Sequence, residues 1–190
     1  FSDPNWLQQP TQLHDEIAAD PDVAKVDLIN GAVGTPTLTQ LQGYDIVVPL
    51  STYAFVDATT LGDNLASYVD GGGVVVQCAS TFTDNALAVR GRWLTGNYAP
   101  YNYGGGTFTG QFQASIDNAA HPLMTGITTL TFLARQATTL STGATRVASI
   151  LPGGEPLLAY RPVSGGHTTV GITAYLGNSN HSADWGKLIV

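Results

Sequence analysis

Two apolar segments on either side of an amphipathic helix constrain the fold more than any other feature of the sequence. Residues 44–50 (YDIVVPL) form a largely apolar segment of the kind found in strands buried on both faces. Residues 57–69 carry apolar side chains along one stripe with helical spacing, and the glycines 71–73 end this helix. Residues 74–77 (VVVQ) are a second buried strand. The order strand, helix, strand indicates a parallel sheet covered by helices.

The other segments complete a single domain over residues 1–190. Helices are also expected at residues 5–19, which include Trp6, at 83–89 and at the C-terminus, with a helical turn at 35–41 and strands at 23–29, 130–133, 137–140, 145–150, 156–160 and 168–174. We therefore expect an α/β fold, a doubly wound, mostly parallel sheet whose β-rich second half adds an antiparallel extension at one edge. Such a sheet normally begins with a central strand. None precedes Phe1, so we expect that first strand to lie upstream, in a longer polypeptide.

Charged residues are scarce and their balance is acidic. They make up 11% of the chain, and 7 Lys and Arg stand against 14 Asp and Glu, for a net charge of −7. Nucleic acid and anionic membrane surfaces require clustered cations, so neither is an expected partner. The apolar runs are too short for membrane insertion. An uncharged polar surface of this kind is common in secreted and cell-surface bacterial modules, so we expect an extracellular or cell-surface location.

No metal site and no cofactor are expected from the sequence. The four histidines are scattered, and neither a C-x-x-C nor an H-x-x-x-H pattern occurs. The glycine triplets at 71–73 and 104–106 lack the strand-to-helix setting or the nearby lysine of a phosphate-binding loop.

Three segments resemble class I glutamine amidotransferase-like domains, especially their trehalose-utilisation (ThuA-like) branch. They are residues 41–77 (LQGYDIVVPLSTYAFVDATTLGDNLASYVDGGGVVVQ), residues 120–130 (AHPLMTGITTL), similar to a His-Pro-x-x-x-Gly segment, and residues 168–185 (TTVGITAYLGNSNHSADW). The resemblance covers the chain from about residue 35 to the end, and it is poorest over residues 91–115. It implies a flavodoxin-like sheet that here lacks its first central strand.

The resemblance also places the single cysteine near a catalytic position. In the catalytic members a nucleophilic cysteine lies in a Gly-x-Cys-x-Gly turn after a buried strand. Here the corresponding residues are Val76-Gln77-Cys78-Ala79-Ser80, so both glycines are replaced. The family histidine would fall close to Tyr175, whereas His181 comes several residues later. A thiol without an adjacent base is mostly protonated at neutral pH. We therefore expect an inert Cys78, while a Cys78–His181 pair or a role for Ser80 stays an alternative.

A glycine- and aromatic-rich excursion at residues 91–115 offers the candidate binding surface. Its aromatic residues are Trp93, Tyr98, Tyr101, Tyr103 and Phe108. Aromatic rings bury a large area at a low cost in side-chain entropy, which suits protein contacts and sugar stacking. Three interpretations are open: the rings pack on their own sheet, contact another protein, or stack on carbohydrate.

Taken together, these features indicate a non-catalytic structural or interaction module. We expect it to belong to a secreted multidomain protein and to contact neighbouring domains or copies of itself through the excursion. One alternative is a hydrolase or isomerase of the amidotransferase-like superfamily acting on a sugar or amide, with Cys78, His181 and Ser80 as its candidate residues. The other is a carbohydrate-binding module.

Overall fold

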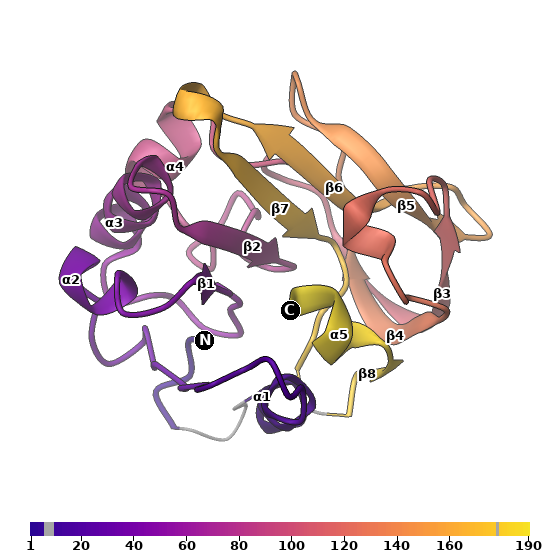
Figure 1. Ribbon diagram of the computed structural model, residues 1–190. Coiled ribbons are helices and arrows are strands. Elements are labelled where there is room, and N and C mark those ends of the chain that lie inside the picture. Colours follow the sequence, from indigo (N-terminus) through magenta and orange to yellow (C-terminus); the bar gives the residue numbers. More distant parts are fainter. Residues whose placement is uncertain (6–9, 178) are drawn as a thin grey trace.

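One strongly curled sheet organises the molecule (Figure 1). In the computed structural model, which describes residues 1–5, 10–177 and 179–190, the sheet has eight strands in the order β1-β2-β7-β6-β5-β3-β4-β8. The strands are β1 (Ile46–Val47), β2 (Val74–Cys78), β3 (Thr107–Ile116), β4 (Leu130–Gln136), β5 (Thr145–Leu151), β6 (Pro156–Pro162), β7 (Thr168–Ile172) and β8 (His181–Ala183). The α-helices are α1 (Thr11–Ala18), α2 (Leu38–Leu41), α3 (Ala58–Asp70), α4 (Gly91–Thr95) and α5 (Trp185–Ile189), with short 3-10 turns at Pro122–Met124 and Ser164–Gly166.

The sheet is mixed and mostly antiparallel, which corrects the expected doubly wound, flavodoxin-like fold. Among the described strands, β2 runs parallel to β1 and β7, whereas the five other neighbouring pairs are antiparallel. A parallel pair joined in sequence needs a long crossover connection, and α3 supplies one between β1 and β2. The strands from β3 onward are joined mainly by turns and loops. Because β7 lies directly beside β2, the sheet is continuous without the central strand that was expected upstream.

The curl brings β4 back against the chain that follows β7. Arg135 of β4 forms an antiparallel bridge with Ala174, two residues beyond the end of β7. The backbone N–H of Gln136 donates to the carbonyl of Thr173 at 2.9 Å. The sheet therefore forms a curled half-barrel in which β4 meets the chain that continues from β7. An apolar core fills its interior, with Trp185 of α5 fully buried in it.

The helix at the centre of the sequence prediction is confirmed within one residue at each end. Asp57 caps α3 by accepting hydrogen bonds from the N–H groups of Thr59 and Thr60. At Gly62 a Cβ atom would lie 1.8 Å from the carbonyl oxygen of Arg90, so only glycine allows this approach of α3 to the start of α4. β2 is also confirmed, with one residue added at its end.

Other expected elements are absent or shorter among the described residues. The segment 44–50 contributes only the two-residue, half-buried edge strand β1, and residues 23–29 form no strand. Residues 83–89 form turns instead of a helix, because the Asn85 side chain accepts from the N–H of Leu87 and the Thr83 hydroxyl, and such local bonds compete with a helix. The segment 137–140 forms no strand, and its Leu140 makes an isolated antiparallel bridge with Tyr101. Of the helix expected at 5–19, α1 is present, and Trp6 lies outside the described residues.

None of the helices in the described part of the chain has the length and hydropathy needed to cross a membrane.

Candidate functional site

Cys78 ends β2 and lies inside the core. Its relative exposure is 0%, and its Sγ hydrogen bonds to the carbonyl of Val76 at 3.7 Å. Burial raises the pKa of the Cys78 thiol to about 12, because a thiolate would lose its hydration there. In the described part of the chain, the hydrogen bonding of this sulfur involves a backbone carbonyl and no imidazole. At neutral pH the thiol is protonated and shielded from solvent.

The turn after β2 carries Ser80 in a left-handed backbone conformation, with φ 71°. Its N–H donates to Oε1 of Gln136 at 2.9 Å, and Nε2 of the same amide donates to the carbonyl of Gly104 at 2.8 Å. Gln136 therefore fixes this turn to the excursion. The left-handed residue of this turn is Ser80, two residues after the buried Cys78, and turns and bends instead of a helix follow it.

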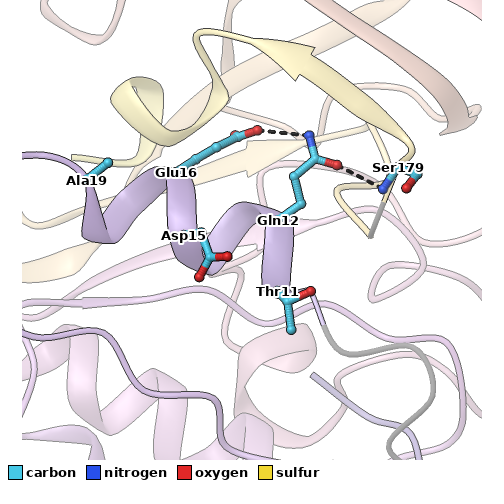
Figure 2. A pocket seen from close by; sticks show the side chains of 6 residues that line it. All are labelled: Thr11, Gln12, Asp15, Glu16, Ala19 and Ser179. Atoms are coloured by element: carbon cyan, nitrogen blue, oxygen red, sulfur yellow. Dashed lines mark hydrogen bonds between the residues drawn. The ribbon is translucent and has the colours of Figure 1, made fainter.

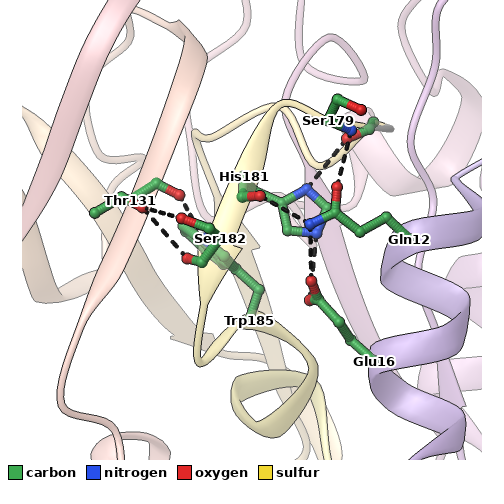
Figure 3. A network of polar contacts seen from close by, with 8 residues as sticks. Gln12, Glu16, Thr131, Ser179, His181, Ser182 and Trp185 are labelled. Atoms are coloured by element: carbon green, nitrogen blue, oxygen red, sulfur yellow. Dashed lines mark hydrogen bonds and ion pairs between the residues drawn. The ribbon is translucent and has the colours of Figure 1, made fainter.

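His181 is paired with Glu16 instead of Cys78 (Figure 3). Its ring is fully buried, with Nδ1 3.1 Å from the carbonyl oxygen of Gly177 and Nε2 3.3 Å from Oε2 of Glu16 on α1. Burial lowers the pKa of His181, and the Glu16 carboxylate acts in the opposite direction because it stabilises the protonated ring. The structure therefore does not bring Cys78 and His181 together as a catalytic pair.

Gln12 extends this pair into a network that ties α1 to β8. Its Nε2 donates to Oε1 of Glu16 at 2.9 Å and to the carbonyl of His181 at 2.8 Å, and its Oε1 accepts from the N–H of Ser179 at 2.8 Å. Figure 2 shows Gln12 and Glu16 lining a hollow of about 670 Å³ on this side of α1, with Asp15 beside them. No pattern in the sequence indicates the Glu16–His181 pair, because its members lie far apart along the chain.

The aromatic residues of the excursion pack mainly on their own protein. Trp93, Tyr98 and Tyr101 are buried, and Tyr103 is half-buried. Trp93 Nε1 donates to Gln77 at 2.9 Å, so the ring is fixed beneath the sheet surface. Of the interpretations left open for the excursion, packing on its own protein applies to these rings, and a partner contact over residues 91–115 stays a prediction.

Phe108 remains as the exposed aromatic residue of that set, at 49%. The physical reason is its place on β3, a strand that extends away from the turns that bury the other rings.

An uncharged groove of about 690 Å³ lies where β3 separates from the end of β5. Its lining includes Gln111, Phe112 and Gln113 of β3, Leu133 of β4 and Leu151 of β5. Ser182 and the buried His181 line it from β8. Leu133 and Leu151 are 43% and 45% exposed, and with Phe108, further along β3, they are the large exposed apolar side chains of β3, β4 and β5; we call these three residues the apolar surface beside the groove.

Arg135 supports the aromatic side of this surface from below. Its guanidinium lies 4.8 Å from the ring centre of Phe108 and 5.2 Å from that of Phe112. Its Nη2 donates to Oε1 of Glu155 at 2.9 Å. Arg135 thus contacts both rings from a buried position, and its Nε and Nη1 have no hydrogen-bond partner among the described residues.

Within the described residues, no group of three or more histidine, cysteine or acidic side chains is placed to hold a metal ion.

No protein-family model and no curated protein sequence matches this chain. Solved structures do match. A cytoplasmic protein of Salmonella typhimurium superposes with a TM-score of 0.70 at 16% identity, covering 95% of this chain and 83% of that one. A second cytoplasmic protein, from Salmonella typhimurium LT2, gives 0.67 at 14% identity, covering 94% and 79%. A ThuA-like protein of Bacteroides uniformis gives 0.52 at 12% identity, covering 78% and 64%.

At these identities the similarity extends to the fold alone. The resemblance to ThuA-like domains is therefore supported as a similarity of fold, and a secreted multidomain origin is not. The expected extracellular or cell-surface location was wrong: the two proteins that align with more than nine-tenths of this chain are both described as cytoplasmic. The inference from composition failed because a surface with few charged residues can be hydrated by its uncharged polar side chains in any compartment.

Proposed function

We propose that this chain is a non-catalytic protein-interaction module. The observation that carries the proposal is the environment of Cys78, where a nucleophile would be expected from the resemblance. A nucleophilic thiol needs an adjacent base and access for substrate. Cys78 is fully buried with a pKa raised to about 12, and the candidate base, His181, lies against Glu16 instead.

The surface beside the groove supports an interaction role. Phe108, Leu133 and Leu151 expose between 43% and 49% of their area on neighbouring strands. Exposed apolar side chains on adjacent strands are a common feature of protein contact sites. The groove next to them is lined by amide, hydroxyl and apolar groups, so a partner would not have to strip water from carboxylates or ammonium groups there.

The non-catalytic part is tested by alkylation of Cys78 with iodoacetamide. We expect the folded protein to react far more slowly than a free thiol such as glutathione, and the protein in concentrated urea to react at the free-thiol rate. The matched control is the double variant Cys78→Ala with Thr107→Cys, which has one thiol at an exposed strand position and should react while folded. Alkylation of folded Cys78 faster than glutathione would refute the proposal, since it requires an accessible and activated sulfur.

A second candidate function is binding of a neutral saccharide in the same groove. It is favoured by the uncharged polar residues Gln111, Gln113 and Ser182 in the lining of the groove, because amides and hydroxyls suit uncharged sugars. Titration calorimetry with neutral oligosaccharides would detect binding. The signal should be lost in Gln113→Ala and kept in the distant control Asn102→Ala. Equal binding by both variants would reject the groove as the sugar site.

A further inference from the structure

One part of β3 is paired on a single side. β3 pairs with β4 from Thr107 to Gln113, but its pairing with β5 begins only at Gln113. Residues 107–111 are all exposed, and no described residue pairs with their second edge. An edge of this kind is a template for another strand. The β-bulge after Thr109 interrupts the regular edge and leaves a three-residue segment, Thr107 to Thr109.

The direction of the backbone groups on this edge follows from the pairing with β4. The N–H of Ala137 donates to the carbonyl of Gly106 at 2.9 Å. Antiparallel pairs alternate, so the backbone groups of Phe108 also face β4, whereas those of Thr107 and Thr109 face away from it. The free edge thus presents two N–H and two C=O groups placed symmetrically about Phe108.

We propose that a second copy of this chain adds to this edge as an antiparallel strand, related by a two-fold axis at Phe108. Thr107 of each copy then forms a hydrogen-bonded pair with Thr109 of the other, giving four inter-chain hydrogen bonds. Phe108 faces Phe108 of the second copy in the closer, non-hydrogen-bonded pair, where aromatic rings interact across strands. This inference rests on the proposed interaction function and names its partner.

Three observations favour a second copy over a foreign peptide. The edge is only three residues long before the bulge, so it cannot hold a long extended peptide, yet it is self-complementary about its centre. Residues 104–116 carry no charge, so two copies of a chain with net charge −7 meet here without local repulsion. Phe108 is 49% exposed while its inner face rests on Arg135, so the ring is already oriented.

The experiment is sedimentation velocity of the full chain over a wide range of concentrations, with two charge variants. Thr107→Lys with Thr109→Lys places like charges opposite each other twice in the proposed pairing. Thr107→Lys with Thr109→Glu places opposite charges there instead. Both positions are exposed, so each double variant should fold, and circular dichroism checks this. We expect the wild type to form a dimer in a concentration-dependent way, and the two variants to differ about tenfold in dimer affinity, with Lys–Lys the weaker.

A wild type that stays monomeric at every concentration would overturn the inference, as would equal dimerisation of the two variants. These results are distinct from a failure of the proposed function. If the protein is monomeric and Cys78 resists alkylation, the dimer is refuted and the proposed interaction function is not. If folded Cys78 is alkylated rapidly, the proposed function is refuted whatever mass sedimentation gives.

Discussion

Tyr101 tests where the excursion lies, because the sequence left open whether its ring packs on its own sheet or contacts a partner, and the structure places it in the interior. The side chain is 1% exposed and packs against Phe82 with 5.0 Å between ring centres. Its hydroxyl lies 3.0 Å from the carbonyl oxygens of Leu157 on β6 and Gly171 on β7. The ring therefore joins the excursion to two central strands.

The expected losses follow from these contacts. Tyr101→Phe removes only the hydroxyl, and the carbonyl of Leu157 still accepts the N–H of Thr173, so the free energy of unfolding should fall by about 1 kcal/mol. Tyr101→Ala also removes a fully buried ring, which costs about 3–5 kcal/mol. That is a large share of the roughly 5–15 kcal/mol available to a single domain.

Urea unfolding followed by tryptophan fluorescence measures both variants. Phe108→Ala serves as the control, because its ring is half exposed and its loss should cost less than about 1.5 kcal/mol. If Tyr101→Ala costs no more than Phe108→Ala at an unchanged m-value, the Tyr101 ring is not in the interior, and the placement of the excursion against β6 and β7 is refuted.

Three further predictions concern other contacts. Glu16→Gln should move the titration of the His181 ring to lower pH in an NMR experiment, since it removes the carboxylate that raises this pKa against burial; an unmoved titration would exclude the pairing. Hydrogen bonds from the backbone before β4 lower the pKa of Asp184. Ionised Asp184 therefore contributes stability above the unfolded pKa of about 3.9, and this contribution is lost as pH falls through the lower folded pKa. The melting temperature of Asp184→Asn should therefore fall less between pH 5 and pH 2 than that of the wild type. Equal falls in the two proteins would contradict this. Gly62→Ala should lower the free energy of unfolding by about 1–3 kcal/mol, because its Cβ would meet the Arg90 carbonyl. An unchanged midpoint in chemical denaturation would argue against this packing of α3 on α4.

Local patterns predicted the elements of this fold better than their arrangement. The apolar stripe and glycine end of α3 depend on neighbours in sequence, and so does the short apolar run of β2. The strands β4 to β7 were likewise expected near their observed positions. Strand direction is different, since an apolar strand has the same composition whether its partner is parallel or antiparallel. The strand–helix–strand pattern was real, but it describes only the β1–α3–β2 part of the sheet.

For the candidate site too, only the features that depend on neighbours in sequence could be predicted. The absence of flanking glycines at Cys78 was visible in the sequence and agrees with a buried sulfur. The engagement of His181 by Glu16 was not visible, because it depends on α1 packing beside β8. Exposure within the excursion was also hidden: Trp93 and Phe108 are both aromatic residues close to glycines, and only the tertiary fold separates a buried ring from an exposed one.

The position of β7 between β2 and β6 has a consequence for synthesis of the chain on the ribosome. Val76 of β2 pairs with Val170, so β2 has no neighbour on that side until β7 has been translated. Until then, nascent β2 and β6 each expose a strand edge that only β7 will cover. A ribosome stalled before residue 168 would hold a chain in which β2 and β6 each have an unpaired edge, so chaperone protection should matter most before β7 is synthesised.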